Sequence, residues 1–155
     1  MKRVVAICCL MLLGVACASS PSSREPKPEI LGVRLGMSRD EARARLQIIG
    51  QLEKEERRQQ EVWKLAGDPN YTHLIVAFDK GYTAVRYVTA VANEQGGRVR
   101  YADVIDTRLA REETTPATRT YTQEIPARGS QPGYVVKAIG SDPESLKYYS
   151  VERLE

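Results

Sequence analysis

The spacing of apolar residues predicts an amphipathic helix near the start of the chain. Ala42, Leu46 and Ile49 follow one another at intervals of four and three residues, so they share one helical face, and the arginines between them are expected to face water. Ser38 and Glu41 have the spacing of a capping box, which satisfies free backbone N–H groups at a helix N-terminus. The glycine after Ile49 is expected to end the helix in a left-handed conformation. The sequence therefore predicts one helix between Ser38 and Ile49.

The rest of the chain alternates apolar and polar residues in the manner of β-strands. Leu74, Val76 and Phe78 show the two-residue period most clearly, and turns rich in glycine, proline and aspartate separate the segments. The expected strands are residues 61–65, 72–79, 83–92, 119–126, 134–139 and 145–153. Residues 98–112 leave two alternatives open, a strand or a short helix. The predicted fold class is α+β, with helices packed on one face of an antiparallel sheet.

The order of these segments indicates a tandem duplication. Residues 31–92 and 98–155 each contain a helical stretch followed by three strands, and the second helical stretch, at about 103–112, follows the first at an offset of roughly 60 residues. In both halves an apolar strand and a turn with glycine and aspartate precede a strand with aromatic and basic residues. We therefore expect a duplicated helix-plus-three-strand unit, although two unrelated hairpins would give a similar pattern.

Residues 1–18 have the features of a signal peptide. Lys2 and Arg3 precede an apolar run of about a dozen residues, which is the length of a signal-peptide core and too short to span a bilayer. Two cleavage sites are open. The segment that ends in Cys17 resembles a bacterial lipobox, so cleavage before Cys17 would expose a thiol for lipidation, whereas cleavage before Ser19 would remove the cysteine. The first site is favoured because polar and charged residues follow Cys17 directly.

Composition after the signal peptide narrows the possible chemistry. Residues 19–29 are rich in serine, proline and charge and are expected to form a flexible tether to a domain at 30–155. All three cysteines lie in the first 17 residues, which excludes a disulfide or a cysteine metal site within that domain. The formal charge of +3 falls to about +1 once the two basic residues of the signal peptide are removed, and the remaining charges are mixed. We therefore expect no nucleic-acid partner.

Few residues have the types and spacing that catalysis needs. His73 is the single histidine, and without a cysteine or a second histidine it forms no common metal site or nucleophile–base pair. Asp103 and Asp106 could form a carboxylate pair, but a local cap explains them more simply. The sequence has no phosphate-binding glycine loop and no nucleophile elbow. We therefore expect a protein that is not an enzyme, with no catalytic residue, metal, cofactor or small-molecule substrate.

The aromatic residues are the strongest indication of a binding surface. The chain has one tryptophan and eight tyrosines but a single phenylalanine, and amphipathic rings of this kind are enriched at protein interfaces. Two alternatives remain open, because the rings could fill the core between helices and sheet or lie with basic residues on an exposed sheet face. The residues proposed for such a partner-binding face are Trp63, Arg86, Tyr87, Tyr121, Lys137 and Tyr148.

Two stretches of the chain resemble a known family. In LGVRLGMSRDEARARLQIIG, Gly36, Met37 and Ser38 lead into the predicted helix, and EVWKLAGDPNYTHLIVAFDKG has a tryptophan-bearing strand and a strand that ends in Phe78 and Asp79. This pattern resembles the SmpA/OmlA-type lipoproteins of the outer-membrane assembly machinery and the related fold of the β-lactamase inhibitor protein. The resemblance implies a non-catalytic bacterial cell-envelope lipoprotein, outer-membrane-anchored or periplasmic, that binds or scaffolds a protein partner. The alternative that it implies is a secreted protein inhibitor of an extracellular or periplasmic enzyme.

Overall fold

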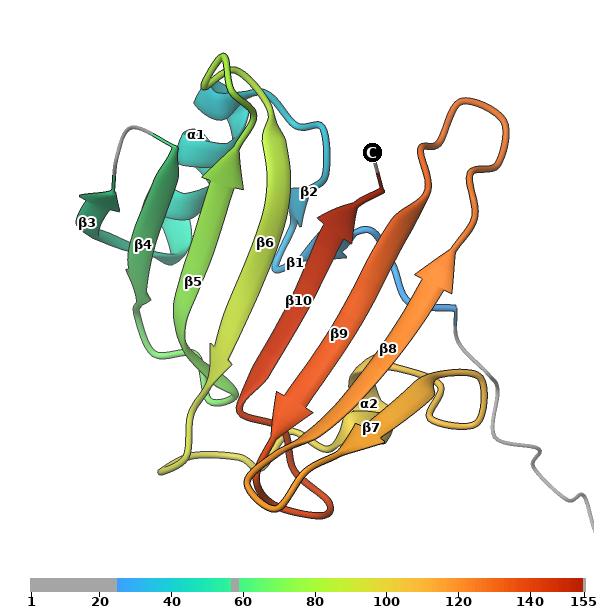
Figure 1. The fold of residues 1–155 in the computed structure, drawn as a ribbon. Helices are drawn as coiled ribbons and strands as arrows, with labels where there is room; N and C mark the ends of the chain where they lie inside the picture. Colours follow the sequence, from blue (N-terminus) through green and yellow to red (C-terminus); the bar gives the residue numbers. More distant parts are fainter. Residues whose placement is uncertain (1–24, 57–58, 155) are drawn as a thin grey trace, which may run out of the picture.

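The computed structural model describes residues 25–56 and 59–154, and the predicted signal peptide with Cys17 lies outside the described residues. Eight strands form one antiparallel sheet in the order β3-β4-β5-β6-β10-β9-β8-β7, and β1 and β2 form a separate two-stranded ribbon (Figure 1). In chain order the elements are β1 (Glu29–Ile30), β2 (Val33–Arg34), α1 (Arg39–Ile49), β3 (Gly50–Glu56), β4 (Gln60–Leu65), β5 (Tyr71–Phe78), β6 (Val85–Ala92), α2 (Tyr101–Val104), β7 (Arg111–Thr114), β8 (Arg119–Ile125), β9 (Tyr134–Gly140) and β10 (Tyr148–Arg153).

The predicted fold class, a sheet with helices packed on one face, is wrong. Strands account for 49% of the structure and helices for 12%, so the protein is mostly β. The prediction lacks β3 and β7, which are the two edge strands of the sheet. Both carry almost entirely exposed, charged sequence, so they show no alternation of apolar and polar residues that would reveal a strand. Each half of the sheet therefore has four strands instead of the expected three.

The second predicted helix is much shorter than expected. Its sequence range, about 103–112, is helical only in α2, which has four residues. The carboxylate of Asp106 accepts a hydrogen bond from the backbone N–H of Arg108 at 3.1 Å, and such local side-chain bonds compete with helix formation. The chain then enters β7 at Arg111.

The first helix forms as predicted, with a capping box at its start. The Ser38 hydroxyl accepts from the Glu41 N–H at 3.3 Å, and the Glu41 carboxylate accepts from the Ser38 N–H at 3.1 Å. Gly50 ends the helix, but its φ of −171° is extended rather than left-handed. A glycine is required there because an added Cβ would lie 2.4 Å from the Lys64 carbonyl oxygen. The chain thus passes directly from α1 into β3.

The sheet consists of two four-stranded halves with the same element order. In each half a helix precedes four antiparallel strands, and the halves join where β6 pairs with β10. The sheet strands within residues 31–92 therefore lie on one side of this seam, and those within residues 98–155 lie on the other (Figure 1). This order agrees with the proposed duplication, which itself stays a prediction.

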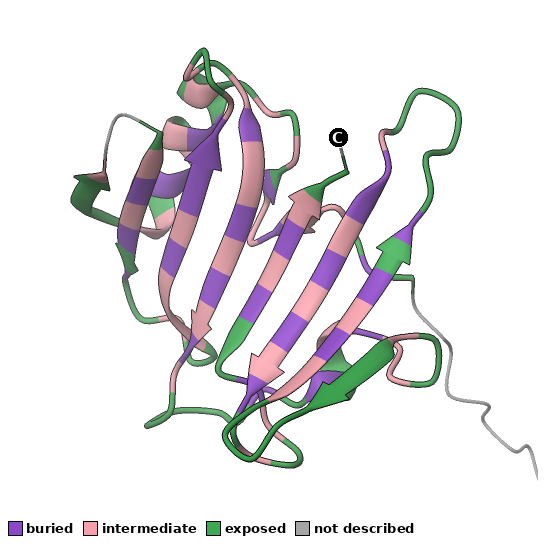
Figure 2. Ribbon diagram, in the orientation of Figure 1, coloured by how far each residue is buried: buried purple, intermediate pink, exposed green. Residues whose placement is uncertain are grey.

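One face of the sheet is covered and contains the core. Leu74, Val88, Val136 and Val151 are fully buried on this face, and they come from β5, β6, β9 and β10. In the first half α1 covers these side chains, whereas β1 and β2 lie behind the middle of the sheet and α2 lies behind β8 (Figure 1). Along each central strand, buried residues alternate with half-buried ones, as Figure 2 shows. This alternation assigns each side chain to one of two faces.

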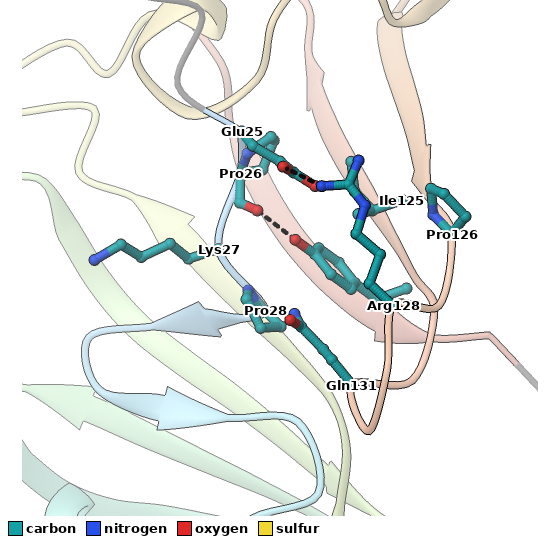
Figure 3. A pocket seen from close by; sticks show the side chains of 9 residues that line it. Glu25, Pro26, Lys27, Pro28, Ile125, Pro126, Arg128 and Gln131 are labelled. Atoms are coloured by element: carbon teal, nitrogen blue, oxygen red, sulfur yellow. Dashed lines mark hydrogen bonds and ion pairs between the residues drawn. The ribbon is translucent and has the colours of Figure 1, made fainter.

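The N-terminal residues 25–29 belong to the folded domain, which corrects the prediction of a flexible tether over 19–29 for this part. The Tyr134 hydroxyl donates to the carbonyl of buried Pro26, and the Arg128 guanidinium pairs with Glu25 at 3.0 Å (Figure 3). The carbonyl of Pro28 accepts from the Leu35 N–H at 3.0 Å. These contacts hold the segment, here called the strap (residues 25–28), across the ends of β8 and β9. Polar composition alone did not reveal that its backbone has partners.

Candidate protein-binding face

The second face of the sheet is open, because both helices and the β1–β2 ribbon lie on the other side (Figure 1). Cross-strand partners point to the same face, so the strand register aligns the side chains in rows across the sheet. We call this surface the open face. Its three central rows are His73, Val91, Tyr148 and Ile139; Val62, Ile75, Thr89, Ser150, Lys137 and Thr122; and Gln60, Ala77, Tyr87, Glu152 and Val135.

The open face is a mixture of apolar, hydroxyl and charged side chains. Val62, Ile75, Val91 and Ile139 are half-buried by their neighbours in the sheet, and 37% of Tyr148 is exposed. On the covered face the corresponding β-branched side chains are fully buried. Such a mixture of accessible apolar area and polar groups differs from a core and is compatible with a protein interface.

Basic residues lie near the centre of the open face. The Glu152 carboxylate of β10 lies 3.9 Å from the Arg86 guanidinium of β6 and 3.6 Å from the Lys137 ammonium of β9. Arg86 also lies 5.9 Å from the centre of the Tyr87 ring, whose hydroxyl donates to Gln60 at 2.6 Å. Burial raises the pKa of Tyr87, so this hydroxyl stays protonated. Arginine and tyrosine are residues that contribute strongly to binding when a partner covers them.

The structure divides the six residues predicted for the partner-binding face between the two faces. Arg86, Tyr87, Lys137 and Tyr148 lie on the open face. Trp63 and Tyr121 lie on the covered face and are only 3% and 8% exposed. The sequence contained a signal for this division. Trp63 lies an even number of residues before the apolar residue that ends β4, and Tyr121 lies an even number before the apolar residue that ends β8, so each shares the face of that apolar residue.

A buried polar cluster beneath α1 was not predicted. The Glu61 carboxylate is fully buried on β4, and its Oε1 accepts from the Arg43 guanidinium and from the Tyr82 hydroxyl, each at 2.7 Å. Its Oε2 accepts from the Trp63 indole N–H at 2.9 Å. The Arg39 guanidinium lies 3.8 Å from the centre of the Tyr82 ring. The arginines of α1 therefore reach the sheet instead of facing water only, and this Glu61 cluster attaches the helix to β4.

The candidate catalytic residues do not form one site. Asp103 pairs with Arg100 at 2.8 Å, and Asp106 pairs with Arg108 at 3.0 Å. Hydrogen bonds from these arginines lower the pKa of both carboxyl groups, which keeps them ionised and unsuited to act as general acids. His73 lies on β5, where its ring contacts a glutamate of β3 at 3.2 Å. Each residue thus has its own local partner.

The described residues contain no group of three histidine, cysteine or acidic side chains placed to hold a metal ion. No helix among them is both long and apolar enough to cross a membrane. No family model matches the chain, and no curated protein or solved structure is significantly similar to it. The resemblance to the SmpA/OmlA-type lipoproteins therefore stays a prediction.

Proposed function

We propose that the protein is a non-catalytic binding module whose open face contacts a protein partner. The observation that carries this proposal is a broad sheet with one covered face and one face of half-buried apolar, tyrosine and basic side chains. Strands about 4.8 Å apart give the sheet a width of about 34 Å, and strand lengths near 20 Å give an area of roughly 700 Å². Stable interfaces bury about 600 to 1,000 Å² on each partner, and the area of the open face falls within this range. The open face is therefore large enough for one.

The proposed compartment is the bacterial cell envelope. The basic residues Lys2 and Arg3, followed by an apolar run, support export. The domain without cysteines is compatible with an oxidising environment. A lipid on Cys17 would attach the domain to the outer membrane, where the partner would be an envelope protein that this module binds or scaffolds. An inhibitor of a secreted enzyme would use the same face without the anchor.

The anchor is tested by labelling the full-length chain with palmitate in a bacterial host. We expect label on the native chain and none on a Cys17→Ser variant. Equal labelling of both chains would contradict the anchor but would not contradict the proposed binding face.

The binding face is tested by photo-crosslinking in the native envelope. Crosslinkers replace Thr89 and Ser150, which are cross-strand neighbours at the centre of the open face, and a control replaces Ile48, which is 76% exposed on α1. We expect the same partner protein from Thr89 and Ser150, and its loss when Lys137→Glu reverses a central charge. Equal yields from Ile48 would contradict the proposal. A single enzyme as partner, inhibited by the purified domain, would identify an inhibitor.

A further inference from the structure

The outer edge of β8 is only partly paired, unlike the matching strand in the first half. β3 pairs with β4 from Gly50 opposite Leu65 to Glu56 opposite Gln60. β7 pairs only with the first four residues of β8 and begins where Arg111 lies opposite Thr122. Among the described residues, no strand lies beside residues 123–125 on that side, and no backbone hydrogen bond outside the β8–β9 ladder involves them. An unpaired strand edge presents N–H and C=O groups to an incoming chain.

A buried side chain on the same stretch lacks a partner. Gln123 is 8% exposed on the covered face, and its Oε1 has no hydrogen-bond partner among the described residues. A buried polar atom without a partner is unfavourable, and native proteins contain few of them. An added chain beside Gln123 could supply the missing donor.

A cleft of about 230 Å³ lies next to this edge, at the end of β8 (Figure 3). Ile125, Pro26, Pro28 and Pro126 give it apolar walls, and Tyr134 closes it on the β9 side. Because Ile125 and Tyr134 belong to the covered face, a residue paired with Ile125 on an added strand would direct its side chain toward this cleft. Proline walls are rigid, so little conformational entropy is lost when a side chain enters.

Charge selects the kind of strand that this edge would accept. Glu124 is exposed on the open face between Gln123 and Ile125, and it forms no ion pair with any residue that the structure describes. A second copy of the chain, paired antiparallel about this residue, would place Glu124 opposite Glu124, which is unfavourable. A partner strand with lysine or arginine at that position would form a favourable cross-strand pair.

We infer that the free edge of β8 at residues 123–125, together with the proline-lined cleft, binds an extended segment of a partner protein by strand addition. The segment carries a basic residue opposite Glu124 and an apolar residue opposite Ile125. Backbone hydrogen bonds provide the attachment, and these two side chains provide selectivity. This site lies at the edge of the sheet, shares only Glu124 with the open face, and does not depend on binding to that face.

The test is selection of random heptapeptides displayed on phage against the purified domain. We expect enriched sequences that alternate apolar and basic residues. Glu124→Arg should shift the selected charge from basic to acidic, and Gln131→Trp, which fills the cleft from an exposed position, should reduce binding at least tenfold. Glu113→Arg, a reversal on the neighbouring strand β7, serves as the matched control and should leave the selection unchanged.

Hydrogen exchange gives the second readout. An enriched peptide should slow exchange of backbone amides within residues 123–125 and leave the β3 edge unchanged. The inference is overturned if no sequences are enriched, if Glu124→Arg and Gln131→Trp bind the same peptides as the native chain, or if protection appears elsewhere. Concentration-dependent dimers that protect these amides without peptide would also overturn it, in favour of a second copy.

Discussion

The two halves of the sheet share an element order but close their covered faces differently. In the first half α1, with eleven residues and a complete capping box, lies over β4 and is attached by the Glu61 cluster. In the second half α2 is a single turn, and the strap from the N-terminus covers the ends of β8 and β9 instead. The covered face of such a sheet therefore has to be shielded from water in both halves, but the segment that shields it does not have to be a helix from the same half.

The halves also differ in how they treat a buried polar group. Glu61 on β4 has a partner for each carboxylate oxygen, whereas Gln123 on β8 leaves its Oε1 unpaired. The first half also contains a buried atom without a hydrogen-bond partner among the described residues, the Arg39 Nε, but that atom lies 3.8 Å from the Glu61 carboxylate. The second half, with its unpaired Gln123 Oε1 at a partly paired strand edge, has the features of a site that can accept another chain. Among substitutions in the two halves, we expect the largest loss of stability at the Glu61 cluster.

Replacing Arg43 by methionine should destabilise the domain by about 3 kcal/mol. The change leaves the buried Glu61 carboxylate without its main cation, and breaking a buried ion pair from one side is strongly unfavourable. The free energy of unfolding in urea measures the loss. The matched variant Arg119→Met, in the second half, breaks a half-exposed pair with Glu112 and should cost less than about 1 kcal/mol. Equal losses in the two variants would contradict the stated difference between the halves.

Replacing Tyr134 by phenylalanine should cost about 1 to 2 kcal/mol. The variant keeps the ring but leaves the carbonyl of buried Pro26 without its donor. Hydrogen exchange should accelerate in β1 and the strap and stay unchanged in α1. Tyr121→Phe is the control, since Tyr121 lies on the same covered face and no hydrogen bond of its hydroxyl is seen among the described residues. An unchanged strap in the Tyr134 variant would show that packing alone holds this segment.

Replacing Ser38 by alanine should cost about 1 kcal/mol through loss of the helix cap. The Ser38 side chain also lowers the pKa of the Glu41 carboxyl by hydrogen bonding to it. A carboxyl with a lowered pKa in the folded state stabilises the protein above its ordinary pKa, and this contribution disappears as the pH falls through the folded pKa. Denaturant unfolding of both chains between pH 7 and about pH 3 should therefore show a difference that narrows in acid. A constant difference would assign the effect to Ser38 alone.

Replacing Gln123 by methionine should have the smallest effect, from no change to a gain of about 1 kcal/mol. The variant keeps the side-chain length but removes the buried oxygen that has no partner among the described residues. The midpoint of thermal unfolding measures the change. A loss of more than about 1 kcal/mol would mean that the amide is well satisfied in solution, which would remove one of the differences between the halves.

Local patterns predicted the elements that the sheet buries. The capping box and the apolar spacing of α1 specified that helix, and alternation located β5, β6, β9 and β10 to within a few residues. The edge strands β3 and β7 escaped because neither is buried on either face, so no apolar period marks them. The alternation of apolar and polar residues in β4 and β8 indicates that Trp63 and Tyr121 point to the covered face. Grouping the aromatic residues by type alone does not use this alternation. The Glu61 cluster depends on tertiary contacts between α1, β4 and Tyr82, which no local pattern contains.

The last strand of the chain, β10, lies in the middle of the sheet, between β6 and β9. During synthesis from the N-terminus, β6 and β9 must therefore wait for β10 before their inner edges are paired. A chain truncated before Tyr148 would expose two long apolar edges at once and would be prone to aggregate. The sheet is consequently completed at its centre, when β10 enters between β6 and β9, and not by the addition of a strand at an outer edge.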